Sequence, residues 1–182
     1  MDEPGRVRLY EMNSGRLLAF SHWNLVGRLA VSNSEDGGSG NFKWKKNKGD
    51  SQMDFHGALG RGAWRLVADS AGAELELADG TNYRADSIDE LVRLQLGWEI
   101  PVDSLSWWVR GLVAPGEYEE RKIDNEGDLV ELLQNGWHIE YGRYSAVEGI
   151  RLPARLTARK ADWKVKLVVR HWVLGEESGS SE

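Results

Sequence analysis

The sequence predicts a mainly β fold: an incomplete, half-open antiparallel β-barrel of about ten to eleven strands, covered by short α-helices and enclosing an apolar cavity. Apolar residues recur at every second position in many stretches, as in Leu25, Leu29 and Val31, which is typical of half-buried antiparallel strands. Turn signals that contain glycine separate these stretches. Because few helical segments are available to cover such a long sheet, it is expected to curl around its own interior.

The strands are predicted in two groups, with helical segments between them. Turn signals such as Asp79-Gly80 and Asn135-Gly136 accept a positive φ angle, so neighbouring strands are expected to form hairpins of one meandering sheet. The predicted strands cover residues 23–33, 40–47, 50–56, 62–68, 73–78, 81–85, 128–133, 136–144, 154–160 and 163–173.

Three segments break the alternating pattern and are predicted to be helical. Residues 7–22 carry only an imperfect apolar stripe. The second segment opens at Asp86 and Ser87, whose side-chain oxygens can cap free backbone N–H groups, and the third is expected to be capped by Asp103 or Ser104. Each of the latter two has one apolar face, formed by Ile88, Leu91 and Val92 in the second and by Leu105, Trp108, Val109 and Leu112 in the third.

The length of 182 residues suits one folded domain, and the sequence shows no internal repeat. We predict a single domain over residues 1–174. Residues 175–182 are rich in glycine, serine and glutamate and carry no apolar anchor, so this tail is predicted to be disordered.

Composition excludes several classes of function. A net charge of −6 argues against a duplex nucleic-acid partner, because such proteins need a basic face to neutralise phosphates. The chain has no cysteine, so disulfides and cysteine-based catalytic or metal sites are excluded for it. No apolar run is long enough to span a bilayer, and the amino terminus lacks the apolar core of a secretory signal. The nine tryptophans suit a core, an interface or a membrane boundary.

No motif for catalysis, a metal or a nucleotide stands out, so we predict neither an enzyme nor a cofactor. The glycine-dense stretch at 57–62 lacks the lysine and the serine or threonine of a phosphate loop. Glu74 and Glu76 alternate with leucines, as on the solvent side of a strand, and the charged run at 117–122 is interpreted as a solvated loop. Catalysis by paired carboxylates stays open. No two histidines have the spacing of a metal pair, and structural roles are expected for His138 and His171.

A loop at residues 55–60 places Leu59 between glycines at a predicted hairpin tip, where polar residues are the rule. Two interpretations stay open. The leucine folds back over the edge of the sheet, or it protrudes as an apolar finger. A finger that entered a membrane interface would gain about 1.5–3 kcal/mol on leaving water.

The order of several motifs resembles the outer-membrane lipoprotein receptor family LolB over residues 23–174. The segment GALG, formed by Gly57, Ala58, Leu59 and Gly60, resembles a family loop with the pattern Gly/Asn-Pro-Leu-Gly. The other stretches that carry the resemblance are WNLVGRLAV at 23–31, ADGTNYRA at 78–85, GWEIPV at 97–102 and LSWWVRGL at 105–112, followed by Tyr141, Leu152-Pro153 and Arg155-Leu156.

The resemblance implies a non-enzymatic receptor that accepts acylated lipoproteins from the periplasmic carrier LolA. It would release them into the inner leaflet of the outer membrane without nucleotide hydrolysis or any cofactor, and it is expected to act as a monomer. The leucine of the family loop maps to Leu59 and is associated with membrane insertion of the cargo. Lipoprotein acyl chains are the implied ligand, and the cavity residues expected to contact them are Leu25, Leu29, Ile88, Leu91, Val92, Leu105, Trp108 and Val109.

Two departures from the family pattern bear on this interpretation. Ala58 stands where the family commonly has proline, so the loop has lost a residue that fixes φ. The family is anchored at the periplasmic face of the outer membrane by an acylated amino-terminal cysteine that follows a signal peptide. This chain shows neither feature and is expected to be soluble.

The main alternative is a β-rich lipid-binding or scaffolding domain without transfer activity. Any helix that packs on a sheet shows an apolar stripe, so each predicted cavity residue is equally well explained as core filling. A filled interior would bind no fatty acid. A hydrolase with unrecognised carboxylates is the remaining alternative, and neutralising one or two inward carboxylates would abolish its activity.

Overall fold

The computed structural model describes residues 1–57 and 62–175. Within them, eleven strands form one antiparallel sheet with the order β6-β5-β4-β3-β2-β1-β11-β10-β9-β8-β7. Their bounds are β1 (His22–Ser32), β2 (Gly37–Asn47), β3 (Asp50–Gly57), β4 (Trp64–Asp69), β5 (Gly72–Leu77), β6 (Asn82–Ala85), β7 (Glu120–Ile123), β8 (Leu129–Gln134), β9 (Trp137–Val147), β10 (Ile150–Lys160) and β11 (Trp163–Gly175).

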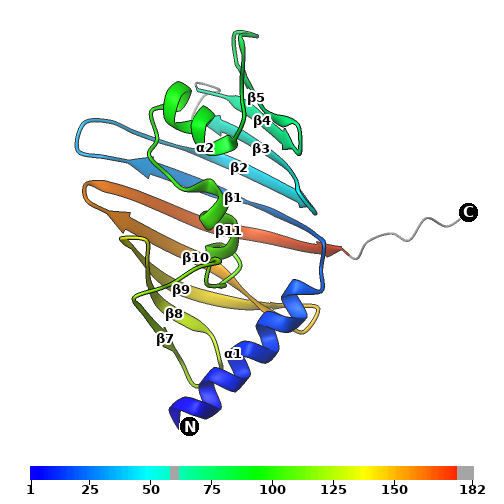
Figure 1. Ribbon diagram of the computed structural model, residues 1–182, viewed down its shortest axis with the longest axis vertical. Coiled ribbons are helices and arrows are strands. Elements are labelled where there is room, and N and C mark those ends of the chain that lie inside the picture. Colours follow the sequence, from blue (N-terminus) through cyan, green and yellow to red (C-terminus); the bar gives the residue numbers. More distant parts are fainter. Residues whose placement is uncertain (58–61, 176–182) are drawn as a thin grey trace, which may run out of the picture.

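The first and last strands join the two halves of the sheet at its centre. Leu25 of β1 is paired with Trp44 of β2 on one side and with Trp172 of β11 on the other. β6 and β7 form the two outer edges and do not pair with each other, so the sheet stays open (Figure 1). The predicted incomplete antiparallel barrel is therefore confirmed.

The helices form two groups, one before β1 and one after β6. α1 (Glu3–Leu18) contacts β7 and β10. α2 (Ile88–Leu91), the π-helical turn η2 (Val92–Leu96) and α3 (Val102–Trp108) follow β6 in the chain. Figure 1 shows this segment in green, running across one face of the sheet from the β6 edge towards the β7 edge. Residues 86–116 are called the cover segment below.

All ten predicted strands are present, with bounds within a few residues of those predicted. One strand was missed, because the charged run at 117–122 was wrongly interpreted as a loop and β7 begins within it at Glu120. β7 pairs only with β8, as an edge strand. Its half-exposed position explains why charged residues such as Arg121 and Lys122 are compatible with a strand here.

The predicted helix bounds need two corrections. α1 begins at Glu3, because the Asp2 side chain accepts a 3.0 Å hydrogen bond from the Gly5 N–H, and it ends before His22, which starts β1. α3 begins at Val102, one residue before the predicted caps. Its first N–H group is satisfied by the carboxylate of Asp89 at 2.7 Å, a residue of α2 that replaces a local cap. The predicted Ser87 cap of α2 is confirmed by a 3.2 Å bond from the Glu90 N–H.

One apolar core draws on α1, both halves of the sheet and the cover segment. Trp44 and Trp108 are the largest side chains that are completely buried in it. β11 extends to Gly175, which pairs with His22, so the strand runs two residues beyond the predicted 163–173 and includes the first residue of the expected tail. The remaining residues of that tail, 176–182, lie outside the described part of the chain.

Candidate functional site

The candidate site is the apolar interior between the sheet and the cover segment. The eight residues predicted to contact acyl chains all lie in it, since each is at most 9% exposed and belongs to the core. Two of them, Leu25 and Leu29, lie on β1. The other six lie on the cover segment: Ile88 and Leu91 on α2, Val92 at the start of η2, and Leu105, Trp108 and Val109 in or directly after α3.

A buried amide fixes the cover segment to the sheet. The Gln134 side chain at the end of β8 is 0% exposed, and its oxygen accepts hydrogen bonds from Trp108 Nε1 at 2.9 Å and from the Ala114 N–H at 3.0 Å. Its Nε2 donates to the carbonyl oxygens of Ala114 at 2.8 Å and Glu117 at 3.2 Å. Gln134 thus satisfies four polar groups of the chain between α3 and β7.

Two tyrosines add further polar contacts to the same segment. Tyr141 of β9 donates a 2.7 Å hydrogen bond to the carbonyl oxygen of Trp108, and the Val113 N–H donates a 3.1 Å bond to the Tyr10 hydroxyl. Burial raises the pKa of Tyr10 and raises that of Tyr141 well above its usual value, so both phenols are neutral at physiological pH. The cover segment is held by a small number of directed bonds in an otherwise apolar interface.

Aromatic side chains of this interior pack against one another. Trp23 packs on Trp44 and Trp172 with ring centroids 5.2 and 5.7 Å apart, and Trp108 packs on Trp137 at 6.3 Å. Four cavities of about 490 to 600 Å³ lie elsewhere, and none of these four is lined by any of the eight predicted contact residues. Contact of those residues with acyl chains stays a prediction.

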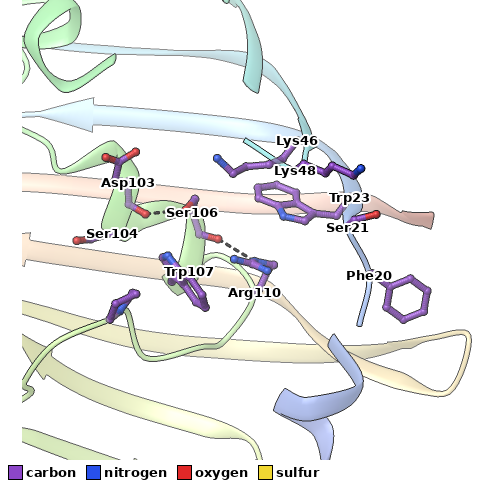
Figure 2. Close-up of a pocket in the computed structure, with 11 residues that line it drawn as sticks. Phe20, Ser21, Trp23, Lys46, Lys48, Asp103, Ser104, Ser106, Trp107 and Arg110 are labelled. Atoms are coloured by element: carbon purple, nitrogen blue, oxygen red, sulfur yellow. Dashed lines mark hydrogen bonds between the residues drawn. The ribbon is translucent and has the colours of Figure 1, made fainter. Parts of the chain in front are cut away.

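One cavity of about 590 Å³ lies at the rim of this interior, where α3 faces the start of β1 and the end of β2. Figure 2 shows Arg110 next to Trp107, with Trp23 above it and the Lys46 side chain extending in the direction of Asp103. The lining residues are Phe20, Ser21, Trp23, Lys46, Lys48, Asp103, Ser104, Ser106, Trp107, Arg110 and Pro115.

Arg110 is the most deeply buried cation of this rim cavity, with 8% of its surface exposed. Its guanidinium carbon lies 4.9 Å from the ring centre of Trp107 and 5.4 Å from that of Trp23, and its Nε donates a 3.0 Å hydrogen bond to the Ser106 carbonyl. Burial lowers the pKa of Arg110 to about 10 and also lowers that of Lys46. Arg110 therefore remains charged at neutral pH.

The predicted membrane loop is only partly within the described structure. Gly57 ends β3 and pairs with Gly40 of β2. Ala58, Leu59 and Gly60 lie outside the described residues, so both interpretations of Leu59 stay predictions.

Two groups of titratable side chains on the β7–β9 side of the sheet have local partners. His138 Nε2 lies 2.7 Å from a carboxylate oxygen of Glu131, as expected for a structural histidine. An acidic group at the β7–β8 turn brings carboxylate oxygens of Asp124, Glu126 and Asp128 within 4.8 Å of one another. Asp128 is paired there with Arg151 at 2.7 Å, which neutralises one of the three charges.

Sequence reasoning missed Arg110 and Gln134 as residues of the site. Arg110 interrupts the apolar pattern of 105–112, and a charge at a position next to Val109 and Leu112 was the available signal. Gln134 gave no signal, because one amide at the end of a strand has no distinguishing neighbours.

The sequence of the chain matches a known protein family. A family model described as outer membrane lipoprotein LolB matches residues 21–172. The chain belongs to the LolB family. LolB proteins are lipoprotein receptors and not enzymes, so the prediction of a non-enzymatic protein is confirmed.

Relatives of known name support the assignment over nearly the full chain. The outer-membrane lipoprotein LolB of Pseudomonas paraeruginosa (strain PA7) is 35% identical over 172 residues, which are 94% of this chain and 84% of that protein. LolB of Stutzerimonas stutzeri is 33% identical with the same coverage. These relatives are outer-membrane lipoproteins. In the described residues of this LolB chain, no helix is long and apolar enough to cross a membrane.

Solved structures with the same fold have very different sequences. A putative outer-membrane lipoprotein-sorting protein domain from Vibrio parahaemolyticus has a TM-score of 0.57 at 9% identity and covers 97% of this chain and 94% of its own. A LolA superfamily protein from Nitrosomonas europaea has a TM-score of 0.54 at 8% identity, covering 94% of each chain. The LolB chain therefore shares the fold of the LolA superfamily.

Proposed function

We propose that this LolB chain accepts acylated lipoproteins from a LolA-type periplasmic carrier and inserts them into the inner leaflet of the outer membrane. In this proposal it acts as a monomer at the periplasmic face and needs neither a nucleotide nor a cofactor. The observation that carries the proposal is the apolar interior under the cover segment, in a chain of the LolB family.

The interior can provide the free energy for accepting acyl chains. Burying a chain contributes about 0.8 kcal/mol for each CH₂ group, so a small difference in burial between two carriers sets the direction of transfer. Ligand entry has to displace the packed side chains or lift the cover segment. The bonds at Gln134 and Tyr141 are the polar contacts that such a movement would break first.

Insertion into the membrane is assigned in this proposal to the loop at 57–60. A leucine at the tip would enter the membrane interface, and its gain of about 1.5–3 kcal/mol would give weak and reversible attachment. Ala58 in place of the family proline makes the loop less constrained, so a variant with proline at this position should present the leucine more rigidly.

One observation favours a second candidate function. The eight predicted contact residues are buried in one packed core, and such a core is equally compatible with a β-rich lipid-binding or scaffolding domain that transfers nothing. The two functions differ in uptake. A receptor takes up acylated lipoprotein from its carrier, whereas a scaffolding domain leaves the lipoprotein on the carrier.

The test is transfer of an acylated lipoprotein from its soluble carrier to this protein and onward to liposomes. Wild type is compared with Leu59→Glu and with Leu18→Glu, an exposed leucine at the end of α1 that serves as a matched control. Failure of Leu59→Glu at the membrane step alone supports the receptor and the loop. Transfer by Leu59→Glu that equals transfer by wild type removes the role of Leu59, and no acyl-dependent uptake by wild type removes the receptor function.

A further inference from the structure

The rim cavity next to α3 carries an excess of positive charge. Lys46 and Arg110 line it, and Asp103 is the acidic residue among its lining residues. Burial lowers the pKa of Lys46, and the negative charge of Asp103 acts in the opposite direction. This leaves the buried guanidinium of Arg110 without a counter-ion of its own.

Within residues 1–57 and 62–175, no carboxylate forms an ion pair with Arg110. Its Nε bonds to the Ser106 carbonyl, and its planar group lies between two indole rings. The two terminal nitrogens, by contrast, have no hydrogen-bond acceptor in the described part of the chain. These nitrogens are not among the buried unsatisfied atoms of the described residues, so they remain accessible, and a ligand anion in the cavity would bond to them.

A second, independent observation lies in the same cavity. The hydroxyl oxygen of Ser21 is buried and has no hydrogen-bond partner among the described residues, and it is the one side-chain atom there in that condition. Ser21 lines the cavity together with Arg110. Buried polar atoms are nearly always satisfied in folded proteins, so a polar group of a ligand would supply the partner that the Ser21 hydroxyl lacks.

We propose that this cavity binds a phosphate group, with Arg110 as the principal ligand and with Lys46 and Ser21 as supporting ligands. The planar guanidinium offers parallel donors that match the oxygens of a phosphate, the Lys46 ammonium adds a point charge, and the Ser21 hydroxyl donates one further bond. The phosphate belongs either to the headgroup of a phospholipid or to free phosphate in solution.

The walls of the cavity fit a phosphate that is attached to an apolar molecule. Trp23, Trp107 and Pro115 lie beside the cations, so glycerol or the first acyl carbons of a phospholipid would contact carbon surface. The cavity lies at the rim of the covered interior, so a bound headgroup would not have to enter that interior. Phosphate binding at this cavity goes beyond the proposed function and requires neither a lipoprotein nor a carrier.

The test measures binding by isothermal titration calorimetry in phosphate-free buffer. The probes are inorganic phosphate, glycerophosphoglycerol, dihexanoylphosphatidylglycerol below its critical micelle concentration, and dihexanoylglycerol, which lacks phosphate. The proteins are wild type, Arg110→Gln, Lys46→Gln and Lys166→Gln. Lys166 is an exposed residue of β11, so its substitution removes one positive charge far from the cavity.

Arg110→Gln should weaken binding of the phosphate-bearing probes by about 10-fold or more, because a charge-assisted hydrogen bond is lost. Lys46→Gln should weaken it by about threefold, and Lys166→Gln should leave it unchanged. Binding of inorganic phosphate identifies free phosphate as a sufficient ligand, whereas binding of the lipid alone identifies the headgroup as the source. Binding of dihexanoylglycerol should not depend on Arg110.

Two results overturn the proposal. One is the absence of binding by every phosphate-bearing probe to wild type. The other is equal affinity of wild type, Arg110→Gln and Lys46→Gln, which would place any binding elsewhere. Thermal unfolding monitored by circular dichroism checks that Arg110→Gln is folded; if it is not, Lys46→Gln decides, since its side chain is only half-buried and its loss leaves the core intact.

Discussion

The indole nitrogen of Trp108 donates a 2.9 Å hydrogen bond to the side-chain oxygen of Gln134, and both side chains are completely buried. Trp108 ends α3 of the cover segment, and Gln134 ends β8 of the sheet. The bond therefore joins the two parts of the molecule that must separate if a ligand enters between them. The bond is therefore expected both to stabilise the fold and to hold the cover segment on the sheet.

Replacing Gln134 with leucine should destabilise the fold by about 3 kcal/mol, because the indole of Trp108 and both backbone groups of Ala114 lose their partners in a buried site. Urea denaturation measures the free energy of unfolding. Gln95→Leu is the matched control on η2, where the glutamine is exposed and little change is expected. An equal loss in the two variants would show that the buried amide has no special role.

A close approach at Gly127 fixes α1 against the β7–β8 turn. Gly127 has a φ of +83°, and an added Cβ would lie 2.5 Å from the Cβ of Leu9. Gly127→Ala should therefore cost about 2–4 kcal/mol, from backbone strain and from the displacement of α1. Gly80→Ala has a similar φ of +87° but open space around it, so about 1 kcal/mol is expected.

Urea denaturation of both variants separates the clash from the strain, since only Gly127→Ala has both. Hydrogen exchange should also show faster exchange throughout α1 in Gly127→Ala and unchanged exchange of α1 in Gly80→Ala. Equal stability losses and an undisturbed α1 would mean that the helix does not depend on this contact.

The fold could be predicted from sequence because its strands obey one simple rule. Apolar residues such as Leu25 and Val31 face the interior at every second position, and this alternation locates a strand without knowledge of its neighbours. The strand β7 was not predicted, because an edge strand is half exposed and needs no apolar face. The start of α3 was predicted wrongly, because its cap, Asp89, comes from another helix. A tertiary contact of this kind leaves no local sequence pattern.

The candidate site was predicted less completely. Periodicity identified Leu105, Trp108 and Val109 as inward-facing, and all three are buried. It could not show which side chains of the interior contact one another, because these contacts depend on how distant strands meet. Arg110 was quoted only as part of a motif, since its burial between two indoles results from the position of β1 and not from the residues next to it.

The carboxylate of Asp89 carries a pH-dependent cost. Burial raises its pKa above the usual value of 3.8, so the folded state holds the proton more tightly than the unfolded state. The corresponding loss of stability develops as the pH rises through the folded pKa and is fully present at pH 7. Asp89→Asn removes this charge and keeps an acceptor for the Val102 N–H, so it should stabilise the protein at pH 7 by less than about 1 kcal/mol.

Urea denaturation of wild type and Asp89→Asn over a series of pH values checks the sign. The advantage of the variant should shrink as the pH falls and should disappear below about 3.8, where the aspartate is protonated in both states. Asp89→Ala removes the acceptor as well and should be less stable than wild type at pH 7. A stability gain of Asp89→Asn that is constant with pH would contradict the electrostatic explanation.

Opening of the cover segment should be controlled by Tyr141. Its hydroxyl bonds to the carbonyl of Trp108 at 2.7 Å, whereas the neighbouring Tyr144 bonds to the carbonyl of Leu129 at 2.7 Å, within the sheet. Tyr141→Phe and Tyr144→Phe each delete one hydroxyl and one hydrogen bond to a backbone carbonyl. We expect similar losses of about 1–2 kcal/mol in the free energy of unfolding.

The two variants should differ in the rate at which an acyl chain enters. Only Tyr141→Phe removes a bond between α3 and the sheet, so it lowers the cost of lifting the cover segment and should accelerate uptake of a fluorescent fatty acid about fivefold to tenfold. Tyr144→Phe leaves that attachment intact and should take up the probe at the wild-type rate. Stopped-flow fluorescence measures both rates. Equal acceleration by the two variants would mean that general loosening of the fold admits the ligand, and unchanged rates in both would mean that the chain enters by a route that leaves α3 in place.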